Sequence, residues 1–236
     1  MQLFYNSEIS TEEKKFTFSK DESKHIIKVL RKKEGDTLHI TNGNDYLFNV
    51  QIIVPNDKKC VVEIKDFQKT LNNRNYYLHV AIAPTKNIDR FEWFLEKATE
   101  IGIDEITPLL CKNSERKHLK IDRLNKILQS ALKQSLQYKL PKLNGLTDFK
   151  NFINNKFIGE GFIAHCENDD KKYYLKNIVK LRSRYTILIG PEGDFSLDEI
   201  ENSKKNGFIP INLGKTRLRT ETAGITCCQN INFLHQ

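Results

Sequence analysis

Two short apolar runs near the end of the chain, Tyr185–Ile189 and Phe208–Leu213, are rich in β-branched residues and predict two β-strands. Each run is followed by a loop that begins with glycine, Gly190 after the first run and Gly214 after the second. A Ser-x-x-Glu capping box at residues 196–199 predicts a helix between the two strands. The pattern therefore predicts the order strand, glycine loop, helix, strand, glycine loop, helix.

The same alternation continues towards the N-terminus. Apolar runs predict strands at Tyr76–Ala83, Glu105–Leu110 and Phe162–His165. Apolar residues at helical spacing predict helices over Ile88–Ile101 and Ile121–Leu136. Strands that alternate with helices are typical of a parallel sheet covered by helices. The predicted fold class of this part is therefore α/β, with a doubly wound parallel sheet.

Residues 1–70 follow a different pattern. A helical stretch over Asp21–Val29 precedes three strand candidates, at Leu38–Ile40, Tyr46–Val54 and Cys60–Ile64. Asn42–Asp45 is a strong hairpin signal, because asparagine and glycine adopt the backbone angles that tight turns need. Several short strands joined by tight turns favour a small β-barrel.

A polar, turn-rich segment at Leu71–Asn75 is a plausible linker between the two patterns. With 236 residues, the chain is long enough for two domains of moderate size. We therefore expect a β-rich domain over residues 1–70 and an α/β domain over residues 71–236.

The two glycine loops are candidates for a binding site. In open parallel sheets, ligands bind at the carboxyl ends of the strands, where glycine exposes backbone N–H and C=O groups. Neither loop has the spacing of a dinucleotide-binding fold or of a phosphate loop. Two tight turns without a ligand are the alternative interpretation. The second loop is crowded with Arg217, Arg219, Thr220, Glu221 and Thr222, which favours a site.

The residues of both loops match a known signature. Ile189–Gly193 with Phe195–Ser196, and Leu213–Gly214 with Leu218–Ala223, closely resemble the SPOUT methyltransferases, and the nearest branch is the RsmE family. Residues His25–Arg31 resemble the PUA-like N-terminal domain of that family. The resemblance implies a trefoil-knotted methyltransferase domain, a PUA-like β-barrel that binds RNA, and a homodimer. It also implies S-adenosyl-L-methionine as the donor and N3 of a uridine in 16S ribosomal RNA as the acceptor.

The resemblance also implies roles for single residues. Arg219 would stabilise negative charge on the uracil, and Glu221 would act as a general base for the N3 proton. A carboxylate in the first turn of a helix is also favoured by the helix dipole, so a structural role is the alternative for Glu221. His165 would either line the site or serve packing. The implied donor contacts are Leu188, Ile189, Gly190, Pro191, Glu192, Gly193, Leu213, Gly214, Leu218, Arg219, Thr220 and Thr222.

The net charge of +8 is concentrated in the stretch Lys112–Lys142, which holds nine basic and two acidic side chains. Most charge runs are solvated helix faces. An excess this large and this local favours a polyanionic partner, and contacts to phosphate are the better guess because Tyr138 is the only aromatic residue of the stretch. We predict RNA contacts at Arg116, Lys117, Lys120, Arg123, His25 and Arg31. A barrel that only supports the other domain is the alternative for the last two.

Two positions depart from the family pattern. Gln137 stands where the family has an arginine, and the missing guanidinium weakens an RNA contact there. Asp194 stands where the family has a second glycine after Gly193. Its carboxylate would either repel phosphate or attract the sulfonium of the donor.

The cysteines are odd in number and lack the spacing of a zinc site, so we expect reduced, mostly buried thiols and no metal. They are Cys60, Cys111, Cys166, Cys227 and Cys228. No apolar run is long enough to span a membrane and the N-terminus has no signal-peptide pattern, which predicts a cytoplasmic protein.

Four apolar residues of the last predicted helix are more than one buried stripe needs, which agrees with the implied homodimer. They are Ile225, Ile231, Phe233 and Leu234. Two other functions stay open. One is an RNA-binding module without catalysis, in which the glycine loops are only turns. The other is a SPOUT methyltransferase that acts on transfer RNA or on a ribose 2′-hydroxyl.

Overall fold

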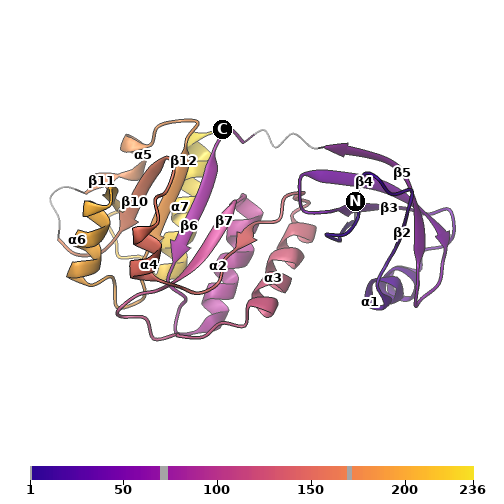
Figure 1. Cartoon of the computed structure of the whole chain (residues 1–236), viewed down its shortest axis with the longest axis horizontal. Helices are drawn as coiled ribbons and strands as arrows, with labels where there is room; N and C mark the ends of the chain where they lie inside the picture. Colours follow the sequence, from indigo (N-terminus) through magenta and orange to yellow (C-terminus); the bar gives the residue numbers. More distant parts are fainter. Residues whose placement is uncertain (1, 70–73, 169–171) are drawn as a thin grey trace. The chain divides into compact units, whose positions relative to one another are not determined.

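The computed structural model describes residues 2–69, 74–168 and 172–236. The chain forms two compact units, one of Met1–Asn72 with Leu132–Leu140 and one of Asn73–Ala131 with Pro141–Gln236 (Figure 1). The predicted domain boundary between residues 70 and 71, and most of the predicted linker, lie outside the described residues.

The N-terminal unit contains a five-stranded sheet in the order β1-β3-β4-β5-β2. Its neighbouring strands pair antiparallel, except that β1 and β3 are parallel. The strands predicted from apolar runs correspond to β3, β4 and β5, whereas β1 and β2 are too short to carry a period. The strands are β1 (Leu3–Tyr5), β2 (Lys15–Thr17), β3 (Thr37–Thr41), β4 (Tyr46–Val54) and β5 (Val61–Lys69).

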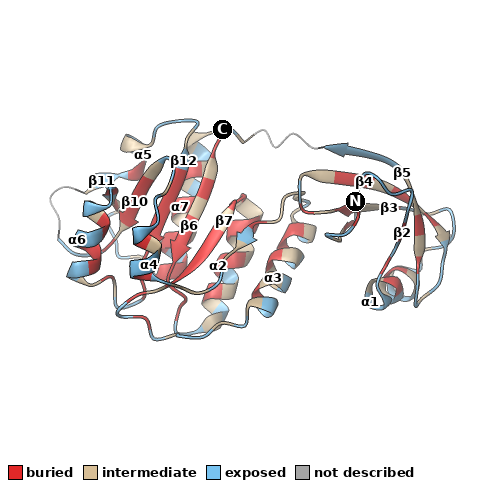
Figure 2. Ribbon diagram, viewed as in Figure 1, coloured by how far each residue is buried: buried red, intermediate tan, exposed pale blue. Residues whose placement is uncertain are grey.

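The predicted helix of this unit is split into two kinds of turn. It begins as α1 (Lys20–Lys24), capped by the Ser19 side chain, and continues as a π-helical segment, η1 (His25–Val29). Ile26 is fully buried and packs in one core with Phe4, Phe48 and Ile52. Figure 2 colours parts of the strands of this unit as buried.

The segment Leu132–Leu140 belongs to the same unit because it is hydrogen-bonded to the β3–β4 hairpin. The Thr41 hydroxyl donates to the Tyr138 carbonyl at 3.0 Å, and the Leu140 N–H donates to the Gly43 carbonyl at 2.9 Å. The end of the basic stretch therefore completes the N-terminal unit.

The second unit is built on an eight-stranded sheet in the order β11-β13-β10-β12-β6-β7-β8, with β9 paired to β7. All its strand pairs are parallel, which confirms the predicted α/β class. The trefoil knot stays a prediction. The strands are β6 (Tyr77–Ile82), β7 (Glu105–Leu110), β8 (Lys142–Leu143), β9 (Thr147–Asp148), β10 (Glu160–Ala164), β11 (Tyr173–Tyr174), β12 (Arg184–Ile189) and β13 (Phe208–Asn212).

Helices pack on both faces of this sheet. On one face α2 packs against α7, and α7 also contacts β6 and β12; on the other, α4 contacts α6 and β7. Gly224 of α7 permits the first packing, because a Cβ there would lie 2.6 Å from the Phe94 ring. The helices are α2 (Ile88–Ile101), α3 (Ile121–Gln134), α4 (Phe149–Asn154), α5 (Leu175–Ile178), α6 (Leu197–Lys205) and α7 (Thr220–Leu234).

The prediction was most accurate for long periodic segments, since the bounds of α2 and β7 agree with the predicted ranges. It missed α4, α5 and the two-residue strands, which are too short to show a period. No helix in the described part of the chain is long and apolar enough to cross a membrane.

Candidate active site

The loops that follow β6, β7 and β12 are joined at the carboxyl end of the second unit's sheet. The Lys86 N–H, after β6, donates to Glu192 Oε1 in the first glycine loop at 2.9 Å. The Asn113 side-chain amide, after β7, donates to the Gly193 carbonyl at 3.1 Å and to the Asp194 carbonyl at 3.1 Å. The first glycine loop is therefore fixed from two neighbouring strands.

Asp194 gives this loop its shape. It has φ of 62°, a left-handed conformation that glycine adopts freely and aspartate tolerates better than most residues. Its carboxylate accepts a hydrogen bond from the Cys166 N–H at 2.7 Å and another from the Phe195 N–H at 2.8 Å. The predicted choice between repelling phosphate and attracting the sulfonium did not include this role, in which Asp194 ties the loop to the segment after β10.

The loop ends in the predicted capping box. Glu199 Oε2 accepts from the Ser196 N–H at 2.8 Å, while Oε1 accepts from the Lys112 N–H at 2.8 Å. The same buried carboxylate thus caps α6 and holds the start of the loop after β7. Gly207, with φ of 87°, lies just past the end of the helix, where glycine commonly ends helices.

The second glycine loop leads into α7 beside the first loop. The buried Thr220 hydroxyl donates to the Gly190 carbonyl at 3.1 Å, so the two loops touch. Arg219 is the exposed N-cap residue of α7 and makes no side-chain cap. Glu221 is buried; its Oε1 lies 3.9 Å from Arg90 Nε, and its Oε2 has no hydrogen-bond partner among the described residues.

Glycine is favoured for different physical reasons at three positions of the two loops. A Cβ on Gly190 would lie 3.0 Å from the Phe195 ring, and one on Gly193 would lie 3.2 Å from Asn113 Cβ. A side chain at either position would crowd these neighbouring protein atoms. At Gly214 a Cβ would meet no atom within 4 Å, so the protein leaves this backbone open. The open backbone at Gly214 and the unpaired carboxylate oxygen of Glu221 fit a cofactor that offers hydrogen-bonding groups and a positive charge.

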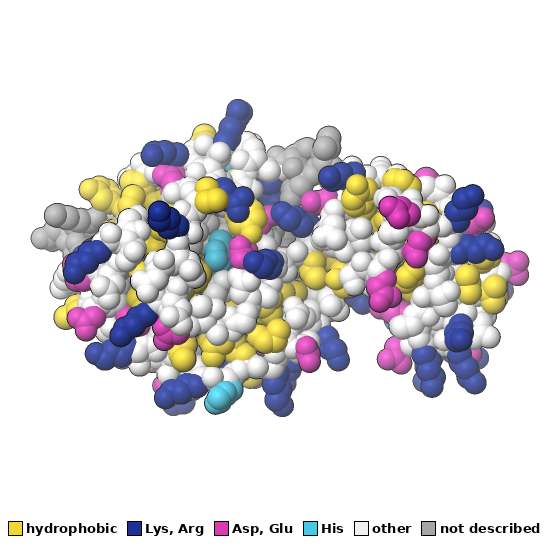
Figure 3. Space-filling model, viewed as in Figure 1, with side chains coloured by type: hydrophobic (Ala, Val, Ile, Leu, Met, Phe, Trp, Pro, Cys, Tyr) yellow, Lys and Arg dark blue, Asp and Glu magenta, His cyan; other side chains and the backbone are white. Residues whose placement is uncertain are grey.

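The predicted RNA contacts in the basic stretch have different surroundings. Arg116 donates to two backbone carbonyls, of Thr85 at 3.0 Å and of Lys86 at 2.5 Å, and so supports the loop after β6. Arg123 forms an ion pair with Glu92, with Nε 2.7 Å from Oε1. Lys117 and Lys120 are exposed. Figure 3 shows basic side chains spread over both units rather than gathered in one patch.

The predicted contacts of the N-terminal unit flank the π-helical segment. His25 begins this segment and is half-buried, and Arg31 follows it as an exposed residue with φ of 55°. π-Helical turns occur often at functional sites, so the local geometry agrees with a role for this surface.

All five cysteines are free; four are buried and Cys166 is exposed. Burial raises the pKa of the Cys228 thiol to about 12, which keeps that thiol protonated and unreactive. His165 is buried directly after β10.

Two models of known families match the chain. The family described as RNA methyltransferase domain matches residues 72–232, and the family described as RNA methyltransferase PUA domain matches residues 18–65. The chain belongs to this RNA methyltransferase family. The expected family and the PUA-like character of the N-terminal domain are both confirmed.

Individual relatives agree with the family. A ribosomal RNA small subunit methyltransferase E from Buchnera aphidicola is 34% identical, over 89% of this chain and 85% of that protein. The crystal structure of a probable rRNA-methyltransferase from Porphyromonas gingivalis is 36% identical with a TM-score of 0.93, and covers 100% of this chain and 98% of its own. A methyltransferase structure from Legionella pneumophila with the bound cofactor SAM is 25% identical with a TM-score of 0.86, over 98% and 96% of the two chains.

Three residues that hold the first glycine loop or its surroundings were not predicted from the sequence to have that role. Lys112 and Asn113 follow β7, where no glycine marks a loop of interest. For Asp194, the prediction considered only the charge of its carboxylate. The carboxyl end of a predicted parallel strand was itself a signal for the first two, because such ends meet at one edge of the sheet.

Proposed function

We propose that this chain transfers the methyl group of S-adenosyl-L-methionine to N3 of a uridine in 16S ribosomal RNA. The observation that carries the proposal is the junction of the two glycine loops through Thr220 and Gly190, beside a buried carboxylate of Glu221 that keeps one oxygen unpaired. The family supports the reaction class, and the names of relatives such as the Buchnera protein support the small-subunit ribosomal RNA as substrate.

The donor would be held mainly by backbone groups. S-Adenosylmethionine, when bound, supplies an electrophilic methyl group on its sulfonium. The hydrogen bonds from Asn113, Lys86 and Thr220 fix the loops in advance, so that little order has to be gained on binding. The residues proposed to touch the donor are Leu188, Ile189, Gly190, Pro191, Glu192, Gly193, Leu213, Gly214, Leu218, Arg219, Thr220 and Thr222.

The acceptor needs two kinds of help from this chain. Uracil N3 carries a proton that must leave as the new bond forms, and Glu221 is the proposed general base because its Oε2 has no hydrogen-bond partner among the described residues. Arg90 lies by the other oxygen, which leaves Oε2 to receive the proton. Arg219, exposed at the start of α7, is proposed to stabilise charge on the uracil oxygens.

Two measurements test this function. Calorimetry with S-adenosylmethionine should show binding to a single class of site, because the donor loops are already joined. Incubation with small-subunit ribosomal RNA and labelled donor, followed by nucleoside analysis, should give N3-methyluridine. Donor binding with methyl transfer to a ribose hydroxyl or to transfer RNA would establish one of the alternatives, and no donor binding would favour a non-catalytic RNA-binding module.

We also propose a homodimer formed through the second unit. Two large apolar side chains lie exposed on the packed helix pair, Trp93 of α2 at 42% and Phe233 of α7 at 67%. Ile231 is fully buried within the unit, so Phe233 is the main exposed residue among the four apolar residues predicted for the dimer contact. A two-fold contact over α2 and α7 would cover these side chains. Light scattering at micromolar concentration should give twice the chain mass, and a monomer would refute the proposal.

The N-terminal domain, residues 1–70, is proposed to bind RNA, and residues 71–236 are proposed to form the methyltransferase domain. His25 and Arg31 beside the π-helical segment are the candidate contacts there, and Arg116, Lys117, Lys120 and Arg123 are those of the basic stretch. A protein that modifies ribosomal RNA works where ribosomes are assembled, so we propose that it is cytoplasmic.

A further inference from the structure

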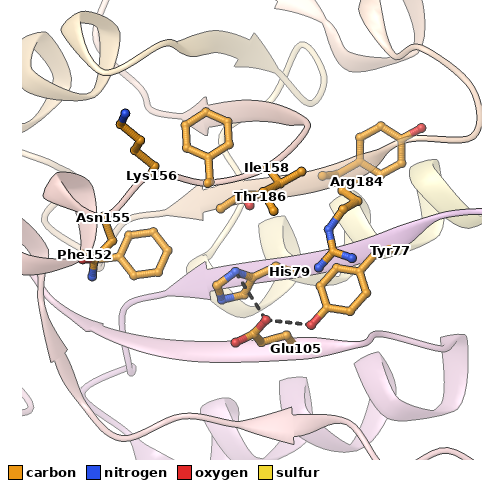
Figure 4. A pocket seen from close by; sticks show the side chains of 11 residues that line it. Tyr77, His79, Glu105, Phe152, Asn155, Lys156, Ile158, Arg184 and Thr186 are labelled. Carbon is orange, nitrogen blue, oxygen red and sulfur yellow. Dashed lines mark hydrogen bonds and ion pairs between the residues drawn. The ribbon is translucent and has the colours of Figure 1, made fainter.

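A pocket lies at the amino ends of the sheet strands, opposite the glycine loops at the carboxyl ends. It has a volume of about 260 Å³ and is lined at the amino ends of three neighbouring strands (Figure 4). Tyr77 begins β6, Glu105 begins β7 and Arg184 begins β12, and the register places these residues and His79 next to one another. Polar, charged and aromatic side chains therefore share one cavity at the amino ends of these strands.

One wall of the pocket is a closed hydrogen-bond network. The Tyr77 hydroxyl donates to Glu105 Oε2 at 2.7 Å, while Glu105 Oε1 accepts from the Asn144 amide at 2.7 Å and from Lys142 at 3.0 Å. Burial alone would raise the pKa of Glu105, but the hydrogen bonds from Asn144 and Tyr77 outweigh it and lower this pKa to about 2. The carboxylate is thus ionised and already used by the protein, which argues against a cationic ligand.

The imidazole of His79 is also engaged by the protein. Its Nε2 lies 2.7 Å from the Thr107 hydroxyl, and its side chain is 13% exposed. Burial lowers the pKa of His79 to about 4 in spite of the nearby Glu105, so the ring is neutral at physiological pH. The remaining charges of the pocket lining are the cations Arg184 and Lys156.

The guanidinium of Arg184 stacks on the Tyr77 ring at the pocket. It lies 3.8 Å from the centre of the Tyr77 ring, and Figure 4 shows it over that ring. A stacked guanidinium keeps its N–H groups free at the rim, and these groups match the oxygens of a phosphate. Arg184 and Lys156 are both exposed side chains, so the rim favours an anion.

The other wall of the pocket is aromatic. Phe152 packs edge-on to His79 with ring centres 5.6 Å apart, and Phe157 also lines the cavity from the segment after α4. Aromatic faces and a guanidinium plane are the surfaces on which unstacked bases are held. The volume lies just below the range of roughly 300–1,000 Å³ for small-molecule pockets, which favours one nucleotide over a larger ligand.

We propose that this pocket binds a single nucleotide, with the base between Phe152 and the Arg184–Tyr77 stack and the phosphate on Arg184 and Lys156. The ligand is either a free nucleotide or one residue of an RNA strand, since both offer the same base and phosphate. The proposal does not depend on methyl transfer, because the donor loops lie at the opposite ends of the same strands.

Titration calorimetry of the full chain with uridine 5′-monophosphate tests the proposal. Arg184→Ala should weaken binding by about tenfold or more, since it removes a charge-assisted contact and a stacking surface. Lys150→Ala removes an exposed cation from α4 outside the pocket and should leave the affinity unchanged. Thermal unfolding of each variant checks that the fold is retained, and Lys156→Ala offers a second variant outside the sheet.

Two further ligands sharpen the test. Inorganic phosphate should bind much more weakly than the nucleotide, because it offers no base to the aromatic wall. A single-stranded RNA oligonucleotide identifies the source. If Arg184→Ala lowers the affinity for the RNA as much as it lowers the affinity for the nucleotide, the natural ligand is an RNA residue. If only the affinity for the nucleotide falls, the natural ligand is a free nucleotide. No nucleotide binding at millimolar concentration, equal affinity in the wild type and in Arg184→Ala, or equal binding of phosphate would overturn the proposal.

Discussion

The two edges of the parallel sheet are built by different physical means. At the carboxyl edge, backbone groups of the glycine loops form the candidate donor site, and side chains such as Asn113 serve to hold those loops. At the amino edge, side chains form the cavity, and Glu105 takes three hydrogen bonds from its neighbours. A backbone site needs a fixed loop, whereas a side-chain site needs every buried polar group paired.

This difference decides what can fail at each edge. A loop held by a few hydrogen bonds loses ligand affinity when one of them is removed, while the fold persists. A closed network around the half-buried Glu105 carboxylate couples ligand binding, stability and pH, because an unpaired charge there is costly. Variants at the two edges should therefore differ in kind as well as in size.

The largest effect is expected at the carboxyl edge, from Arg219→Ala. If Arg219 acts on charge that develops only in the transition state, turnover should fall by about a hundredfold or more. Donor affinity should change little, because the backbone contacts remain. Single-turnover methylation and donor calorimetry separate the two quantities. Lys215→Ala is the matched control, since Lys215 is an exposed cation in the same loop; an unchanged rate for Arg219→Ala, or complete loss of donor binding, would remove Arg219 from its role.

The second prediction concerns the basic stretch that runs from the carboxyl end of β7 back to its amino end. Lys117, Lys120 and Arg123 are all predicted RNA contacts, but Arg123 forms an ion pair with Glu92. Replacing Lys117, Lys120 and Lys126 by Ala avoids leaving that carboxylate alone. The slope of log affinity against log salt for single-stranded RNA should flatten by about two, at about 0.7 per lost phosphate contact.

Anisotropy titrations at several salt concentrations measure this slope. The control is a triple replacement of Lys150, Lys176 and Lys205, which are exposed lysines outside the stretch. Donor affinity should be the same in both triples. If the two triples give equal slopes, the stretch is an ordinary solvated face and RNA binding would fall to the surface around His25 and Arg31.

The carboxyl edge was predictable from the sequence to a degree that the amino edge was not. Glycine loops after apolar runs carry a local signal, and the Ser196–Glu199 box marks the start of a helix within four residues. The network of Tyr77, His79 and Glu105 has no such signal, because the first two residues lie on β6, Glu105 lies on β7, and the strands meet only through the sheet register. The predicted sheet implied that strand starts would meet, but not which strands would be neighbours.

The role of Asp194 shows the same limit on a smaller scale. Its identity suggested a free charge, and only the left-handed backbone and the Cys166 contact reveal a structural use. Asp194→Ala should weaken donor binding by about tenfold, since it strains the backbone and removes two hydrogen bonds. Asp194→Asn keeps an acceptor oxygen and tolerates the same conformation, so it should restore most of the affinity. Calorimetry with equal losses in both variants would point to the charge instead.

The smallest effect is expected at the amino edge, from His79→Gln. The pKa of His79 is about 4 in the folded chain and 6.5 for the free side chain, so between these values the unfolded chain binds more protons. Stability should therefore fall as the pH drops from 6.5 towards 4. His79→Gln keeps a polar group towards Thr107 but cannot titrate, and it should flatten this part of the profile by about 1 kcal/mol per pH unit.

Glu105 and His79 contribute to the pH dependence of stability in different pH ranges. Its pKa is about 2 in the folded chain against 4.5, so its stabilisation is present above pH 4.5 and is lost only as the pH falls further. Denaturant unfolding at intervals from pH 7 to pH 4 should show wild type and His79→Gln converging at the acid end, where the variant has lost less. His118→Gln removes an exposed imidazole and serves as the control. Parallel profiles for wild type and His79→Gln would mean that the imidazole is not buried in its neutral form, and the amino edge would then be open to anions through His79 as well as through Arg184.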